Sequence, residues 1–151
     1  MQPASAEIRA SFPFYAEDSR ALRQLNLALR DAGAAVERTD TFRLLLHATS
    51  EAELFARAVL RYGPDARPAA AGYGDGTGER FTVRVRADWV KKLEQVRDDL
   101  ARKDIDVRRV DVARAVLHAP HDVKKLLREL GRFEAAFPDR RTRVERAKHR
   151  G

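Results

Sequence analysis

Two stretches of the chain have closely similar sequences. VERTDTFRLLLHA begins at Val36 and VRRVDVARAVLHA begins at Val107, an offset of 71 residues. Under this offset residues 9–62 overlay residues 80–133 without a gap, and 14 of the 54 aligned pairs are identical. Residues 63–79, GPDARPAAAGYGDGTGE, lie between the two units and have the Gly, Pro and Ala content of a linker. The chain is therefore predicted to contain one structural unit twice, at 9–62 and 80–133, followed by a basic tail at 134–151.

Each unit begins with a segment of alternating apolar and polar residues, IRASFPF in the first unit and RFTVRV in the second. A period of two predicts a strand. After the strand in each unit, apolar residues three and four positions apart predict an amphipathic helix. They are Leu22, Leu25 and Leu29 in the first unit and Leu93, Val96 and Leu100 in the second. Gly33 is expected to end this helix in the first unit. Two further helices are predicted in each unit, the last of them serving either as extra core or as a dimer surface. The predicted fold class is mainly α.

The two predicted strands need partners, because a single strand leaves its backbone hydrogen-bonding groups unpaired. We expect residues 9–14 to pair antiparallel with residues 80–85, so that one chain forms an internal pseudo-dimer around a two-stranded ribbon. The inner face would carry Ala10, Phe12, Phe14, Phe81, Val83 and Val85. The outer face would carry Arg9, Ser11, Pro13, Arg80, Thr82 and Arg84. A two-stranded ribbon fits the DNA major groove, where Arg can bind guanine and Thr can contact base edges, so these six residues are the predicted base readers.

Positive charge is concentrated in the second part of the chain. The net charge is +7, and residues 1–70 carry nine Arg against nine acidic residues, whereas residues 71–151 carry 21 basic residues against 14 acidic ones. A polyanion is the expected partner of such a surface. The tail is interpreted either as a disordered segment that adds nonspecific DNA affinity or as a solvated helix end; its basic residues are Arg140, Arg141, Arg143, Arg146, Lys148 and Arg150.

The strand, helix and helix of each unit resemble a ribbon-helix-helix DNA-binding domain over about 40 residues. The loop patterns that carry the resemblance are VERTDTFR and VRRVDVAR. The resemblance implies that the outward strand residues read bases and that the start of the second helix binds a phosphate. The implied phosphate-binding residues are Arg38, Thr39, Arg86, Arg108, Arg109 and Val110. Val110 stands where the family prefers Ser or Thr, Glu37 would bring negative charge near a phosphate, and Pro13 donates no hydrogen bond.

Tandem copies in one chain are similar to accessory proteins of plasmid and T-DNA transfer. The expected function is sequence-specific binding of double-stranded DNA, as a transcriptional regulator or as a transfer (relaxosome) accessory factor. Expected partners are DNA and other DNA-processing or transfer proteins, and assembly of several chains on DNA is compatible with the fold. The expected location is the cytoplasm, in association with nucleoid or plasmid, because the sequence has no signal peptide and no membrane-spanning run.

Other function classes receive less support from the sequence. A β-α-β-α repeat acting as a ligand-binding or protein-interaction module would make VERTDTFRLLLHA a strand. No enzyme is predicted, since neither a nucleophile with a base nor a pair of acids stands out, and no cofactor or small-molecule substrate is expected. The chain has no cysteine and its four histidines lack metal-ligand spacing, so no metal site is predicted. Arg43 and Arg114 are interpreted as structural residues that pair with acids or helix ends.

Overall fold

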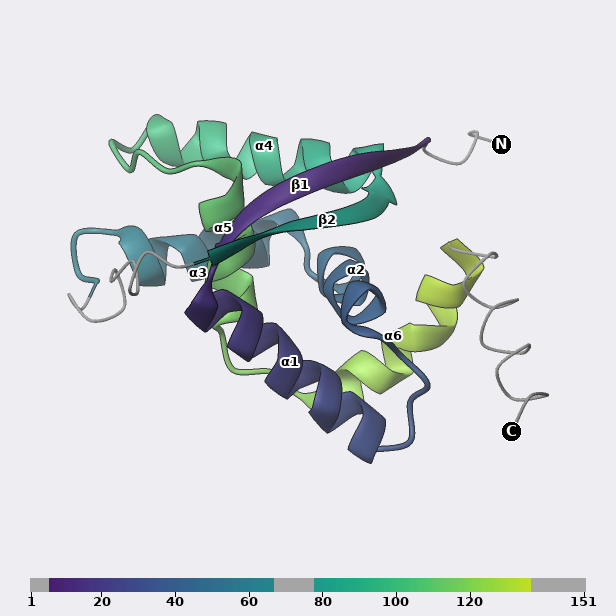
Figure 1. Cartoon of the computed structure of the whole chain (residues 1–151). Coiled ribbons are helices and arrows are strands. Elements are labelled where there is room, and N and C mark those ends of the chain that lie inside the picture. Colours follow the sequence, from purple (N-terminus) through teal and green to yellow (C-terminus); the bar gives the residue numbers. More distant parts are fainter. Residues whose placement is uncertain (1–5, 67–77, 137–151) are drawn as a thin grey trace.

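The computed structural model describes residues 6–66 and 78–136, and it follows the repeat (Figure 1). The first unit contains β1 (Glu7–Tyr15), α1 (Ala16–Asp31), α2 (Arg38–Ala48) and α3 (Glu51–Tyr62). The second contains β2 (Gly78–Arg86), α4 (Ala87–Ala101), α5 (Arg109–Leu117) and α6 (Val123–Ala136). The prediction of a mainly α fold is confirmed. The β-α-β-α alternative is wrong in its secondary structure, because α2 and α5 occupy the segments that it assigns to strands.

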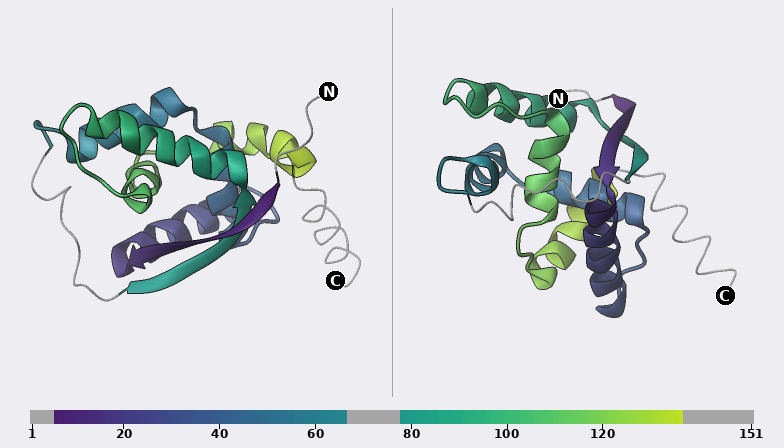
Figure 2. Two further views of the ribbon diagram at one scale, coloured as in Figure 1. Left: turned by 90° about the horizontal axis from the view of Figure 1, so that it is seen from above. Right: turned by 60° about the vertical axis from the view of Figure 1, so that its left-hand side comes forward.

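The two strands form one antiparallel two-stranded sheet. Ser11 lies opposite Thr82, and these two residues are also equivalent under the repeat, so an approximate twofold axis passes between them. Their hydroxyl oxygens lie 3.0 Å apart, which marks the centre of the ribbon with a hydrogen bond. Seen from above, the strands run along one margin of the molecule and α3, α4 and α5 lie on one side of them (Figure 2).

The apolar face of the ribbon packs onto the helices, as its alternating sequence predicts. Ala10, Phe12, Phe14, Val83 and Val85 are buried, and Phe81 is half-buried. An aromatic cluster joins both strands to α2: the ring of Phe42 lies 5.0 Å from that of Phe12, and the rings of Phe14 and Phe81 stack at 5.2 Å. Burying these side chains on one face leaves the polar residues of both strands on the other.

The third helix of each unit packs against the other unit. α3 contacts α4 and α5, while α6 contacts α1 and α2. Leu54 and Ala58 of α3 and Leu126 and Phe133 of α6 are buried in these contacts. The third helices are therefore part of a shared core. α6 continues to Ala136, three residues past the end of the aligned repeat at residue 133.

The helices that follow the two strands end in the same way. Gly33 has φ of 103°, and the equivalent Asp104 has φ of 63°, both in the left-handed region. In each unit the next residue donates its N–H five positions back, Ala34 to the Leu29 carbonyl at 3.0 Å and Ile105 to the Leu100 carbonyl at 3.0 Å. These are the hydrogen bonds of a glycine-type helix end, so the prediction that Gly33 terminates α1 is confirmed.

Candidate nucleic-acid interface

The outer face of the ribbon brings together all six predicted base readers. Arg9, Pro13, Arg80, Thr82 and Arg84 are exposed, and Ser11 is half-exposed beside its partner Thr82. Side chains on this face stand away from the helices because their neighbours along each strand face the core. The face therefore presents three guanidinium groups and two hydroxyls on a rigid two-stranded support.

The two ends of this face differ in charge. At one end Arg9 lies opposite Arg84, and Glu7 binds the Arg84 guanidinium with an N–O distance of 2.9 Å. At the other end Arg80 lies opposite Pro13. This end of the ribbon reaches α1 and α2 through Glu79, whose carboxylate lies 3.5 Å from the Ser19 hydroxyl and 3.9 Å from the Arg38 guanidinium.

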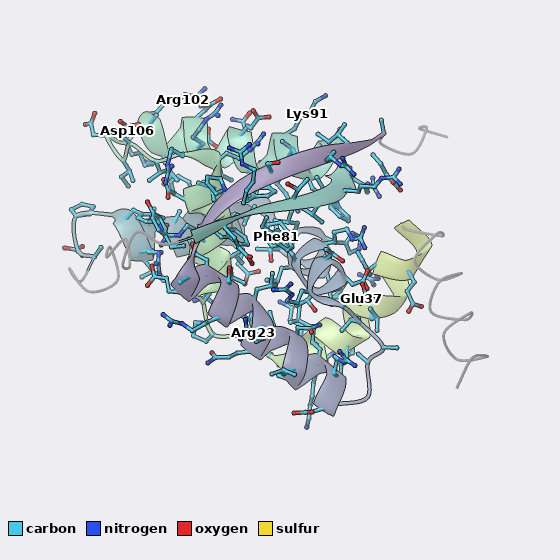
Figure 3. The ribbon with its side chains drawn as sticks, viewed as in Figure 1. Arg23, Glu37, Phe81, Lys91, Arg102 and Asp106 are labelled. Atoms are coloured by element: carbon cyan, nitrogen blue, oxygen red, sulfur yellow. The ribbon has the colours of Figure 1, made fainter. Side chains whose placement is uncertain are left out.

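The start of α2 forms one wall of a polar hollow of about 420 Å³. Its lining residues are Arg23, Asn26, Arg30, Glu37, Arg38 and Thr39. Asn26 is buried and links α1 to the start of α2. Its side-chain NH2 group donates to the Val36 carbonyl at 3.1 Å and to the Thr41 hydroxyl at 2.9 Å. Figure 3 labels Arg23 on α1 and Glu37 at the start of α2, the two sides of the hollow. Three arginines and one glutamate thus line the same hollow.

The start of α5 has no acidic residue at the position equivalent to Glu37. Arg108 stands there instead, and its backbone N–H donates to the Asp111 carboxylate at 2.8 Å. The Arg109 guanidinium lies 5.5 Å from the centre of the Phe12 ring, which places the start of α5 beside the ribbon. Val110 points its side chain into the core, so it can offer only its backbone N–H to a ligand.

Arg86 is already bound within the chain. Its Nε and Nη2 atoms donate to the two carboxylate oxygens of Asp88 at 3.1 and 2.8 Å, and its guanidinium lies 5.7 Å from the Trp89 ring. A role in binding phosphate, as implied for Arg86 from the sequence, would require it to leave Asp88. The six basic residues predicted in the tail lie outside the described residues.

Sequence reasoning missed Arg23 and Arg30, which belong to the first helix and not to the loop pattern. Helical spacing offered the missing signal, since Arg23, Asn26 and Arg30 are three and four residues apart and so share one face of α1. The structural reading of Arg43 is confirmed. Its guanidinium is buried, donates to Asp40 at 2.6 Å and reaches the backbone carbonyl of Arg84 at 3.4 Å, so it anchors α2 to the ribbon from beneath.

Within residues 6–66 and 78–136, no group of three or more histidine and acidic side chains is arranged to hold a metal ion. In the same part of the chain, no helix has the length and apolar character needed to cross a membrane.

No protein-family model, curated protein or solved structure matches this chain.

Proposed function

We propose that this chain is a tandem ribbon-helix-helix protein that binds double-stranded DNA by placing the outer face of its ribbon in the major groove. The observation that carries the proposal is the division of apolar and polar side chains between the two faces of the ribbon. Five of the six inner residues are buried, whereas the outer face presents Arg9, Arg80, Thr82 and Arg84 to solvent. A two-stranded ribbon has the width of the major groove, and Arg and Thr are side chains that bind base edges there.

The starts of α2 and α5 support the same proposal. Both carry basic residues at a helix N-terminus, where the helix dipole favours an anion such as a phosphate. Contacts to phosphates hold a protein in register on the duplex while strand residues read the bases. The protein would serve as a transcriptional regulator or as an accessory factor in plasmid or T-DNA transfer, acting with other DNA-processing proteins.

The test is the affinity of the full chain for random duplex DNA, measured by fluorescence anisotropy at several salt concentrations. We expect log affinity to fall linearly with log salt, by about 0.9 per phosphate contact. On a duplex selected from a random library, the triple variant Arg9→Ala, Arg80→Ala, Arg84→Ala should bind about 100-fold more weakly or worse, since each Arg contact to a base contributes about 1–3 kcal/mol.

A matched control removes the same charge elsewhere. Arg102, directly after α4, and Arg128 and Arg132 on α6 are exposed outside the ribbon, and their triple alanine variant should lose only the affinity that follows from net charge. Equal losses of DNA affinity in the two triple variants would show that the outer face of the ribbon is only a solvated sheet face. Absence of binding to any duplex at low salt would refute DNA binding.

A further inference from the structure

The two halves of the ribbon are not chemically equivalent, although the backbone is nearly symmetric. The approximate twofold axis at Ser11 and Thr82 makes Arg9 equivalent to Arg80, but it makes Pro13 equivalent to Arg84 and Glu7 equivalent to Gly78. A dimer of identical chains has identical side chains at such positions, and its DNA site mirrors that symmetry. Away from the axis, this chain breaks the symmetry at two of the three equivalent pairs just named.

We propose, on the basis of the DNA-binding function proposed above, that one chain binds an asymmetric DNA site in a single orientation. Most base discrimination would come from the half of the site that faces Arg9 and Arg84. The orientation makes the bound protein a directional mark on the duplex, which a symmetric dimer on a palindrome cannot provide.

The groups that can contact bases are concentrated at one end of the ribbon. Arg9 and Arg84 lie opposite each other there, and the Glu7 carboxylate holds the Arg84 guanidinium at 2.9 Å. Arginine binds guanine through two hydrogen bonds, and a carboxylate accepts a hydrogen bond from cytosine. Glu7 both restricts the position of Arg84, whose side chain is 63% exposed, and adds an acceptor of its own.

The other end of the ribbon has fewer side-chain groups that can bond to a base. Arg80 lies opposite Pro13, and Gly78 takes the position that Glu7 has in the first strand. Proline has no side-chain donor or acceptor and glycine has no side chain, so Arg80 alone among these three can bond a base. The helix starts do not reverse this imbalance, since phosphate contacts carry no sequence information.

Direct cleavage of the DNA by tethered reagents tests the orientation. The chain has no cysteine, so one introduced cysteine can carry an iron chelate that cuts DNA nearby. Arg20 and Lys91 are equivalent under the repeat, both are exposed, and they lie on helices that leave opposite ends of the ribbon (Figure 1). With a site selected from a random duplex library, Arg20→Cys should cut on one side only and Lys91→Cys only on the other.

The selected sequences test the cause of the orientation. Arg84→Ala should lower the base preference by about 10-fold in one half of the motif and leave the other half unchanged. Pro13→Arg should add a guanine preference to the weaker half and make the motif more palindromic. Both substituted positions are exposed, so neither variant disturbs the core.

Three outcomes separate this inference from the function on which it rests. One-sided cleavage with a non-palindromic motif supports both. A palindromic motif for one bound chain, or equal cleavage on both sides by each conjugate, overturns the orientation while leaving DNA binding in place. Failure of the wild-type chain to bind any duplex overturns the proposed function and the inference with it.

Discussion

The two repeats share a backbone but place different chemistry where their second helices meet the opposite unit. In the second repeat, Arg114 and His118 on α5 meet Asp18 on α1. Of the equivalent residues of the first repeat, His47 on α2 packs against Trp89 of α4, which stands at the position of Asp18, whereas Arg43 binds Asp40 and the Arg84 carbonyl. One interface is therefore ionic and the other aromatic. The difference shows that helix spacing and turns preserve the fold, while a buried polar residue can change partner provided that it finds one.

The ionic interface is a network of hydrogen bonds and ion pairs around Arg114 and Asp18. Arg114 is 1% exposed, and its Nε atom lies 2.9 and 2.8 Å from the two carboxylate oxygens of Asp18. Its Nη2 atom donates to Glu17 at 2.8 Å, and the Tyr15 ring lies 4.8 Å from the guanidinium carbon. Asp18 also accepts from the Tyr15 backbone N–H at 2.8 Å and contacts His118 at 2.6 Å. A charge held by this many donors satisfies the requirement for burial.

At the aromatic interface, the buried arginine finds its counter-charge within its own helix. Arg43 pairs with Asp40 one turn earlier on its own helix, so it needs no acid on α4. His47 packs edge-on against Trp89 at 5.5 Å between ring centres and lies 6.2 Å from the Phe133 ring. Burial lowers the pKa of His47, and the nearby charges of Lys92 and Arg86 lower it further.

Removing the acid from the ionic interface should have the largest effect on stability. Asp18→Asn leaves the buried Arg114 without its main counter-charge, and breaking a buried pair from one side typically costs about 3–5 kcal/mol. Urea unfolding followed by circular dichroism measures the change in the free energy of unfolding. Glu17→Gln is the control: Glu17 is half-buried in the same network and should cost about 1 kcal/mol or less. A loss below 1 kcal/mol for Asp18→Asn would mean that the network is dispensable.

The sequence predicted the shared backbone but could not predict this contrast. Leu22, Leu29, Leu93 and Leu100 are all buried at the spacing that identified the helices, because apolar periodicity reports which face of a helix meets the core. The strand pairing followed from alternation plus the need to satisfy two lone strands. These inferences depend only on local patterns and on the constant offset.

The partner of a buried charge depends on contacts between residues far apart in the chain. Arg114 and Asp18 are 96 residues apart, and no local pattern links them. The repeat pointed to Arg43 and Arg114 as structural residues that pair with acids or helix ends, but it gave no sign that Trp89 replaces the acid. Likewise the loop pattern named Arg38 and Thr39, while Arg23 and Arg30 enter the same hollow from a helix that the pattern does not cover.

Acidification should distinguish the two interfaces by pH. Burial raises the pKa of Asp18, but hydrogen bonds from His118, from the Tyr15 N–H and from Arg114 outweigh it and hold the pKa below 3.8. A lowered carboxyl pKa gives stability that is present above about pH 3.8 and lost as the pH falls further. The lowered pKa of His47 affects stability at higher pH. Below about pH 6.5 the His47 ring takes up a proton more readily in the unfolded chain than in the folded one, so the stability falls as the pH falls.

Single variants test which residue causes the loss of stability in each of these two pH ranges. In unfolding measurements between pH 2 and 8, His47→Gln should reduce the loss of stability below pH 6.5, whereas Asp18→Asn should reduce the loss below about pH 3.8. Titration of the His47 ring followed by NMR should give a midpoint below 6.5. Identical pH profiles for the wild type and His47→Gln would contradict the role of its burial.

A smaller effect is expected where the third helices differ. Tyr62 and Phe133 are equivalent, but only Tyr62 has a hydroxyl, which donates to the backbone carbonyl of Asp111 at 3.0 Å. Burial raises the pKa of Tyr62 to about 12, so the hydroxyl remains a donor at neutral pH. Tyr62→Phe should lower the free energy of unfolding by about 1 kcal/mol without changing the denaturant dependence. An unchanged stability would show that α3 is held to α5 by apolar packing alone.

The smallest change expected from a single substitution is that of Asp104→Asn, at one of the two matching helix ends. Gly33 and Asp104 occupy equivalent left-handed positions, and Asp104 brings a negative charge to the C-terminal end of α4. Asp104→Asn keeps a side chain that tolerates positive φ and removes the unfavourable interaction with the helix dipole, for a gain of about 0.3–1 kcal/mol. Gly33→Ala changes the equivalent site in the opposite direction: nothing lies within 4 Å of an added Cβ, so its cost of about 1–2 kcal/mol would come from backbone conformation alone. Thermal unfolding of both variants at low salt measures the two shifts. If Asp104→Asn lowered stability while Gly33→Ala left it unchanged, the two turns would not share the conformational constraint that their equivalent dihedral angles indicate.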